Sequence, residues 1–150
     1  MPSRTLDTPT GPFTVTQTDG AITKAGWGGN SHDDTALLQN AAAQIDAYFA
    51  RELDCFDLPL NVQSSQFQRD VCDAMRAIPF GETCTYGDIA RELSAPAQAI
   101  GQACGGNPIP LIIPCHRVLA ASNLGGFSGS FGIETKIALL KHEGAASLLI

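Results

Sequence analysis

One short run combines residue types that can do chemistry: Ile112-Ile113-Pro114-Cys115-His116-Arg117-Val118. The cysteine could be a buried packing residue, a metal ligand, half of a disulfide or a nucleophile. A nucleophilic Cys115 needs a base, because an ordinary thiol is mostly protonated at neutral pH. His116 could be that base if a turn at Pro114 brings the two side chains together, and Glu143 could orient its imidazole. A Cys-His-acid hydrolase would fit these residues equally well.

The chain has five cysteines, which are scattered and include no C-x-x-C pair. Structural zinc sites use clustered cysteine and histidine, and adjacent Cys115 and His116 are an awkward pair of ligands for one tetrahedral ion. In a reducing compartment such cysteines stay free. We therefore expect free thiols and no metal site. The five positions are Cys55, Cys72, Cys84, Cys104 and Cys115.

Length and composition are those of an ordinary globular protein, with 150 residues, 44% hydrophobic and 16% charged. Such a chain can form one substantial core or two small lobes. No apolar run is long enough to cross a bilayer, and the residues after Met1 lack the apolar segment of a secretory signal. We therefore expect a cytoplasmic protein without membrane contact.

The net charge of −6 argues against a broad basic surface for nucleic acid, because neutralising phosphates requires Lys and Arg. The acidity is uneven along the chain. Before Leu58, three basic residues face eight acidic ones, whereas from Leu58 onward six face seven. The window from Leu93 to His116 holds no Lys, Arg, Asp or Glu. A neutral face therefore remains available, where binding would rely on helix dipoles, backbone amides and groove shape.

The first third of the chain predicts a hairpin followed by a helix. Two alternating, β-branched segments flank an Asp-Gly turn, residues 13–18 and 21–27. From Asp34 to Leu53 apolar residues recur at helical spacing, with Ser31 or Asp33 as the N-cap. The stretch 54–63 is expected to be an extended crossover between two lobes.

The rest of the chain predicts short helices bounded by caps, prolines and glycines, at residues 65–78, 85–93, 97–104 and 133–143. Ser64 or Ser65 caps the first, and Thr85 with Asp88 forms a capping-box-like start to the second. The second and third, joined by a tight turn, resemble a helix-turn-helix. Residues 109–113 predict a buried strand that leads to the cysteine.

These elements predict an α/β protein of the α+β type. Residues 1–60 would form a small N-terminal lobe with an antiparallel sheet and a helix. Residues 64–150 would form a mostly helical C-terminal lobe that carries the helix-turn-helix and the active-site cysteine. We expect the protein to be a monomer.

Several motifs follow one another in the second half of the chain. They are FGETCTYGDIA at 80–90, NPIPLIIPCHRV at 107–118, GGFSG at 125–129 and KIALLKHEG at 136–144. Together they resemble the methylated-DNA–protein-cysteine methyltransferase family, the O6-alkylguanine-DNA alkyltransferases. The resemblance covers residues 65–144, and the first sixty residues fit the family's variable N-terminal lobe in outline. It implies that residues 64–150 are the DNA-binding and alkyl-transfer domain.

The resemblance implies a DNA repair protein whose partner is double-stranded DNA containing O6-alkylguanine, with O4-alkylthymine as a second candidate lesion. Family members flip the damaged base out of the duplex and move its alkyl group irreversibly to a cysteine. Carried over, Cys115 is the acceptor, His116 acts through a water as its base, and Glu143 orients His116. Because the thioether product is stable, the protein acts once and needs no cofactor.

Further site residues follow from the same resemblance. Tyr86 would assist rotation of the phosphodiester and donate a hydrogen bond to the leaving guanine. Asn107 would tie the recognition helix to the cysteine. The carbonyls of the cysteine and of Val118, with the Ser128 amide, would hold the edge of the guanine. Phe127 stands where many relatives have tyrosine and would supply an apolar wall without a hydroxyl.

The main departure from the family lies in the recognition helix. Relatives usually carry an arginine that fills the hole left by the flipped base, and this chain has Gln98 there. Glutamine can insert and hydrogen-bond, but it brings no positive charge. Ala97 and Ala99 stay small enough for close approach to the minor groove. We therefore expect weak DNA binding that is unusually salt-sensitive or crowding-dependent, with the transfer chemistry intact. We assign Arg117 a structural role at most.

Another class of function competes with the transferase. A damage-binding module would recognise alkylguanine and signal without accepting the alkyl group. Relatives of that kind replace the cysteine, whereas this chain keeps Cys115, which favours the enzyme. A Cys-His hydrolase would need an oxyanion site and turnover, and nothing in the sequence beyond the Cys-His pair supports it.

Overall fold

The computed structural model describes residues 1–120 and 132–145, and the chain divides into two units, Met1–Gln63 and Ser64–Ile150. The first unit contains β1 (Ser3–Thr8), β2 (Gly11–Thr18), β3 (Ala21–Trp27) and α1 (Ala36–Phe49). The second contains α2 (Gln66–Arg76), β4 (Cys84–Thr85), α3 (Tyr86–Leu93), α4 (Ala97–Gly105), the 3-10 turn η1 (Cys115–Arg117), β5 (Val118–Leu119) and α5 (Ile133–Glu143). The chain is therefore mixed α and β, as its sequence predicts.

The sheet of the first unit is antiparallel with the order β1-β2-β3. The predicted hairpin is confirmed as β2 and β3, but β1 was not predicted. Its residues include a single large aliphatic side chain, so they show no apolar alternation. An antiparallel backbone ladder pairs it to β2 from Ser3 to Thr8. Hydroxyl groups add side-chain hydrogen bonds, with 2.8 Å between the Ser3 and Thr16 oxygens and 2.6 Å between those of Thr5 and Thr14.

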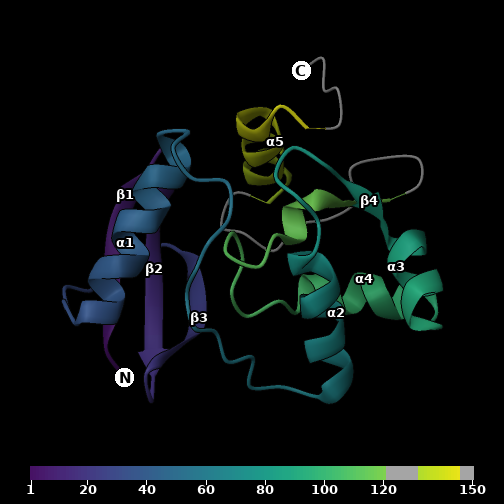
Figure 1. Cartoon of the computed structure of the whole chain (residues 1–150), viewed down its shortest axis with the longest axis horizontal. Coiled ribbons are helices and arrows are strands. Elements are labelled where there is room, and N and C mark those ends of the chain that lie inside the picture. The colour runs from purple at the N-terminus through teal and green to yellow at the C-terminus, as the bar shows by residue number, and fades with distance from the viewer. Residues whose placement is uncertain (121–131, 146–150) are drawn as a thin grey trace. The chain divides into compact units, whose positions relative to one another are not determined.

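Helix α1 lies against one face of this sheet (Figure 1), and the core between them is formed by Phe13, Val15, Ile22, Leu38, Ala41, Ile45 and Tyr48. The N-cap is Thr35, whose hydroxyl accepts a hydrogen bond from the Leu38 N–H. The predicted caps were wrong: the Asp33 carboxylate instead accepts from the Ser3 N–H of β1 at 2.9 Å. The helix also ends at Phe49, four residues before the predicted end, because Arg51 adopts a left-handed φ of 62°.

Helices α2 and α3 of the second unit begin at caps that the sequence predicts. The Ser65 hydroxyl accepts from the Gln68 N–H at the start of α2. Thr85 and Asp88 form a full capping box at the start of α3. Helices α3 and α4 follow each other across the turn at residues 94–96, and the Gln68 amide donates to the Ala103 carbonyl at 2.7 Å. Helix α2 thereby holds the end of α4.

The predicted strand at residues 109–113 is wrong, because this apolar run is a tight buried turn. The Ile113 N–H donates to the Ile109 carbonyl at 2.9 Å, and Leu111 has a φ of 72°. Prolines at 108, 110 and 114 lack the N–H groups that a strand needs for its ladder. The Asn107 side chain closes the turn, since it accepts from the Ile109 N–H and donates to the Ile113 carbonyl. Residues 109–113 are therefore buried as a turn, and the chain continues from this turn directly into η1.

The helices of the described ranges, 1–120 and 132–145, include none with the length and apolar character to cross a membrane.

Thr85→Ala tests the capping box at the start of α3. The free energy of unfolding should fall by about 1 kcal/mol, because the Asp88 N–H loses the hydroxyl that accepts its hydrogen bond. Urea denaturation measures this, with Thr85→Ser as the matched control that keeps the hydroxyl and should stay close to the parent. Equal stability of the alanine variant and the parent would contradict the account.

Candidate active site

Cys115 opens η1, and its side chain is buried, with the residue 5% exposed. The turn forms because the Cys115 N–H donates to the Ile113 carbonyl and the Arg117 N–H donates to the Pro114 carbonyl. In a 3-10 turn successive side chains point about a third of a circle apart, not to opposite faces as on a strand. Neighbouring Cys115 and His116 can therefore serve one site.

His116 is fully buried and pairs with the last residue of α5. Its Nε2 lies 2.7 Å from Glu143 Oε2, and both side chains have no exposed surface. A carboxylate only accepts, so Nε2 carries the hydrogen and Nδ1 is left as an acceptor. Among the described residues, Nδ1 has no hydrogen-bond partner. The structure thus brings together two predicted residues, His116 and Glu143. The Nδ1 atom of His116 is left as a buried nitrogen that can accept a proton.

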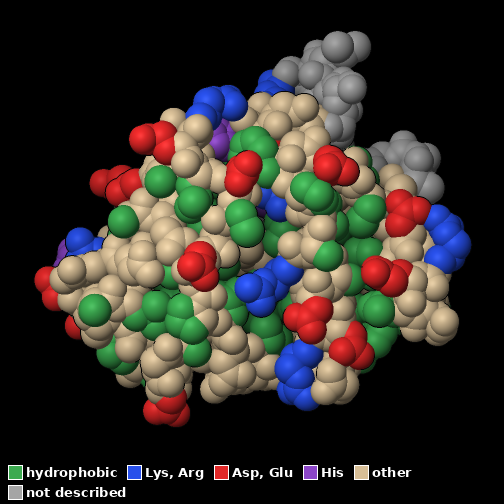
Figure 2. Space-filling model, viewed as in Figure 1, with side chains coloured by type: hydrophobic (Ala, Val, Ile, Leu, Met, Phe, Trp, Pro, Cys, Tyr) green, Lys and Arg blue, Asp and Glu red, His purple; other side chains and the backbone are tan. Residues whose placement is uncertain are grey.

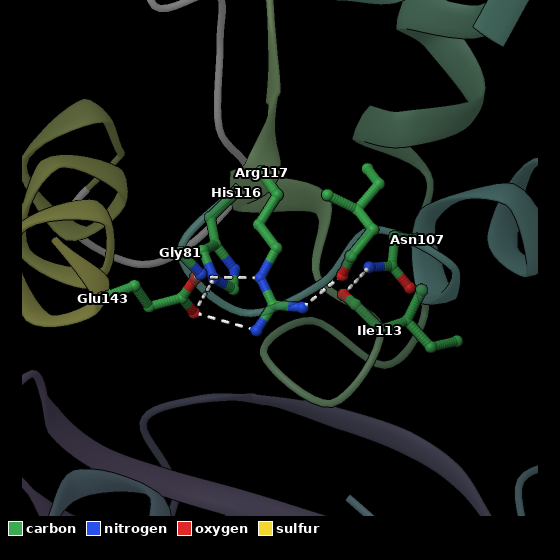
Figure 3. Close-up of polar contacts among 7 residues, drawn as sticks. Gly81, Asn107, Ile113, His116, Arg117 and Glu143 are labelled. Carbon is green, nitrogen blue, oxygen red and sulfur yellow. Dashed lines mark hydrogen bonds and ion pairs between the residues drawn. The ribbon is translucent and has the colours of Figure 1, made fainter. Parts of the chain in front are cut away.

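Arg117 joins the same carboxylate and was missed as a site residue. Its Nε donates to Glu143 Oε1 at 2.8 Å and its Nη2 donates to Oε2 at 3.1 Å, while Nη1 donates to the Ile78 carbonyl at 2.7 Å. Figure 3 shows the guanidinium next to Glu143, with His116 and Gly81 grouped at the same carboxylate. The sequence did contain a signal for this role. Arg117 lies in an apolar run, and an arginine in such a run is buried only when it has an ionised partner.

Lys136 is the second residue that the sequence analysis missed. It is fully buried, and its Nζ donates to the Val118 carbonyl at 2.7 Å. The same nitrogen lies 6.0 Å from the centre of the Tyr86 ring. Burial lowers the pKa of Lys136 to about 8, against the opposing effect of nearby thiols. Lys136 lies three and four residues before Leu139 and Leu140, which places it on the inward face of α5. This spacing is the sequence signal from which its burial could have been predicted.

The thiol and the imidazole both rest in their neutral forms. Burial raises the pKa of Cys115 to about 11, although the Asn107 side chain and Lys136 act in the opposite direction. Burial also lowers the pKa of His116, which Glu143 raises and Arg117 lowers further. At neutral pH the site therefore holds a thiol that needs a base and a neutral imidazole that can be one.

The remaining predicted residues lie on α3, on α4 and in the turn. Tyr86 is the first residue of α3 and is half-buried. Ala97 and Gln98 are exposed in the first turn of α4, and Ala99 is half-buried. Asn107 is buried next to the cysteine turn. The predicted residues Phe127 and Ser128, with the glycine-rich loop around them, lie outside the described residues.

No group of three His, Cys, Asp or Glu side chains that could hold a metal occurs within residues 1–120 and 132–145. All five cysteines are free.

Both units match one protein family. Residues 1–62 match "6-O-methylguanine DNA methyltransferase, ribonuclease-like domain", and residues 66–145 match "6-O-methylguanine DNA methyltransferase, DNA binding domain". The chain belongs to the 6-O-methylguanine DNA methyltransferase family. Its two units thus correspond to the two described domains of that family.

Individual relatives agree with this membership. A methylated-DNA–protein-cysteine methyltransferase of Mycolicibacterium paratuberculosis is 39% identical over 98% of this chain and 96% of its own length. One of Methanocaldococcus vulcanius is 48% identical over 71% of this chain and 63% of its own length. Among solved structures, Mycobacterium tuberculosis OGT in complex with DNA is 40% identical, with a TM-score of 0.87 over 96% of this chain and 93% of that one.

Lys136→Met tests the buried lysine through the pH dependence of stability. Between pH 8 and 10.5 the unfolded parent binds a proton on this lysine that the folded parent has released, so the parent gains stability as pH rises. Relative to the variant, the free energy of unfolding should rise by up to about 1.4 kcal/mol per pH unit, about 3 kcal/mol in all.

Urea denaturation of both proteins at several pH values gives this difference, in which the effects of the buried thiols largely cancel. Lys141→Met, at an exposed position of α5, is the matched control and should follow the parent. Parallel pH curves for the parent and the Lys136 variant would show that the buried ammonium is not destabilised.

Proposed function

We propose that this protein is a DNA repair enzyme that transfers the alkyl group of O6-alkylguanine in double-stranded DNA irreversibly to its own Cys115. The observation that carries this proposal is the buried thiol next to a neutral imidazole whose other nitrogen is held by Glu143. Family membership supports the reaction class, and the geometry supports Cys115 as the nucleophile and His116 as its base. The protein would work as a cytoplasmic monomer.

The reaction begins with loss of the thiol proton. His116 Nδ1 accepts the Cys115 proton through one water, while Nε2–H stays hydrogen-bonded to Glu143. The thiolate attacks the alkyl carbon, a carbon–sulfur bond forms and the bond from carbon to O6 breaks. The electron pair leaves with the guanine, where a hydrogen bond from Tyr86 meets the developing negative charge. The thioether is stable, so each molecule acts once and no cofactor takes part.

Residues around the thiol prepare this step. The Asn107 amide lowers the pKa of Cys115 by hydrogen bonding that favours the thiolate, and Lys136 adds a positive charge in the same direction. Lys136 also holds the Val118 carbonyl at 2.7 Å. A carbonyl oxygen has two lone pairs, so Val118 can accept a second hydrogen bond from the edge of the flipped guanine.

DNA would bind through α3 and α4 of the second unit. Chemistry at O6 requires the base to leave the stack, so a side chain must occupy the gap, and Gln98 is exposed in the first turn of α4 for this role. The surface is not strongly basic: Figure 2 shows Lys and Arg side chains interspersed with Asp and Glu on the visible face. Binding would therefore depend on close approach through Ala97 and Ala99 more than on bulk charge.

Alkyl transfer is tested with an oligonucleotide duplex that contains O6-methylguanine. The intact protein should gain one methyl group, and peptide mapping should place it on Cys115. Cys115→Ala should stay unmodified, whereas Cys104→Ala, which removes another buried thiol, should still be methylated. A parent that binds the duplex and stays unmodified would contradict the transferase and favour a damage-binding module.

Gln98→Arg tests the role of α4. The added charge should tighten DNA binding several-fold and steepen the dependence of affinity on salt by about one ion. The parent should therefore be less salt-dependent than the variant, which reverses the salt sensitivity expected from the sequence. The rate of methyl transfer from saturating DNA should change little, because Gln98 does not belong to the thiol site.

Fluorescence anisotropy at several salt concentrations measures this affinity. Gln102→Arg places the same charge at an exposed position further along α4 and should give a smaller gain. Equal or weaker binding by the Gln98 variant would contradict insertion of this residue into the duplex.

A further inference from the structure

Arg117 and His116 share one carboxylate, and the proposed mechanism leaves this arrangement unused. Glu143 Oε2 lies 2.7 Å from His116 Nε2 and also accepts from Arg117 Nη2, while Oε1 accepts from Arg117 Nε. We propose that Arg117 is a positioning residue that shares the charge of Glu143 with His116 and thereby keeps the imidazole neutral and ready to accept the Cys115 proton. This inference rests on the proposed function and deepens it.

The contact between Arg117 and Glu143 is a two-point ion pair cut off from water. The Glu143 side chain has no exposed surface and that of Arg117 has 7%. A planar guanidinium that donates to both oxygens fixes the plane of the carboxylate as well as its charge. The orientation of Glu143 therefore follows from Arg117, and the orientation of the His116 ring follows from Glu143.

Two further contacts fix Arg117 itself. Its Nη1 donates to the Ile78 carbonyl at 2.7 Å, just beyond the end of α2, and its guanidinium carbon lies 5.9 Å from the centre of the Phe80 ring. The Gly81 N–H points to Glu143 Oε1 at 3.4 Å. Gly81 has a φ of 84°, a conformation that favours glycine. Segment 78–81, η1 and the end of α5 thus meet at one carboxylate.

Burial is the largest influence on the pKa of His116, which it lowers, and the charges that face the ring act in addition. They are Glu143 and Lys136 from α5 and Arg117 from η1, with the Cys115 thiol next to it in the chain. A protonated imidazole would add a positive charge to a buried site where one carboxylate already matches one guanidinium. Without Arg117, the charge of Glu143 would no longer be shared with a guanidinium and would favour the imidazolium more strongly, so that Nδ1 would hold a proton when it needs to accept one.

A purely structural arginine predicts something different. If Arg117 only braces the fold, its replacement lowers stability but leaves the titration of His116 in the folded protein unchanged. If Arg117 sets the charge balance, Arg117→Met raises the pKa of His116, whereas Arg117→Lys keeps a positive charge and largely restores it.

Proton–carbon NMR titration of the imidazoles measures this in the folded protein without DNA, and a His116→Asn variant assigns the signal. We expect Arg117→Met to raise the His116 pKa by about one unit or more and Arg117→Lys by less than half as much. Arg76→Met, at an exposed position of α2, is the matched control and should leave the titration unchanged. In Arg117→Met, the rate of methyl transfer should begin to fall at a higher pH than in the parent, in step with the raised pKa of His116.

The outcomes separate the two proposals. An unshifted His116 titration in folded Arg117→Met overturns the role of Arg117, whether or not the protein transfers methyl groups. Absence of transfer by the parent, with the shift present, overturns the proposed function alone. If Arg117→Met does not fold, folded Arg117→Lys decides: loss of the two-point contact with Glu143 should still raise the pKa of His116 by the smaller amount, and an unshifted titration would overturn the inference.

Discussion

Glu143 ends α5 with a carboxylate that is shielded from water, and a buried charge of this kind persists only if nearby donors match it. His116 matches it with one N–H and Arg117 with two, and the Gly81 N–H points to the same group. Each of these donors comes from a segment that must be placed correctly for the thiol to have a base. The carboxylate therefore links the end of the last helix to the turn that carries Cys115.

The turn before the cysteine makes this meeting possible. Asn107 satisfies the backbone of residues 109–113 from inside, so an apolar run can be buried without a sheet. The chain then enters η1, where the thiol, the imidazole and the guanidinium leave the backbone in different directions. Lys136 fixes the Val118 carbonyl immediately after η1. In the proposed function, recognition of the base edge and activation of the nucleophile would therefore depend on adjacent residues of one short segment.

Local signals in the sequence predicted part of this. Ser65 and Thr85 cap their helices through bonds to residues three positions away, and such bonds depend little on the rest of the fold. The strand β1 was missed because its residues lack apolar alternation, while the backbone ladder and hydroxyl pairs that join it to β2 depend on the folded partner. Likewise, Arg117 was given at most a structural role because its partner is 26 positions away, and such a contact exists only once α5 is packed against η1.

The central claim concerns a single proton on the His116 ring. Nitrogen-15 NMR of the parent at neutral pH, with the His116 signals assigned by the His116→Asn variant, reports which ring nitrogen is protonated. The account predicts a neutral ring with the hydrogen on Nε2, bound to Glu143, and an unprotonated Nδ1. A hydrogen on Nδ1, or a ring protonated at both nitrogens, would contradict it, because the buried base next to Cys115 would then be absent.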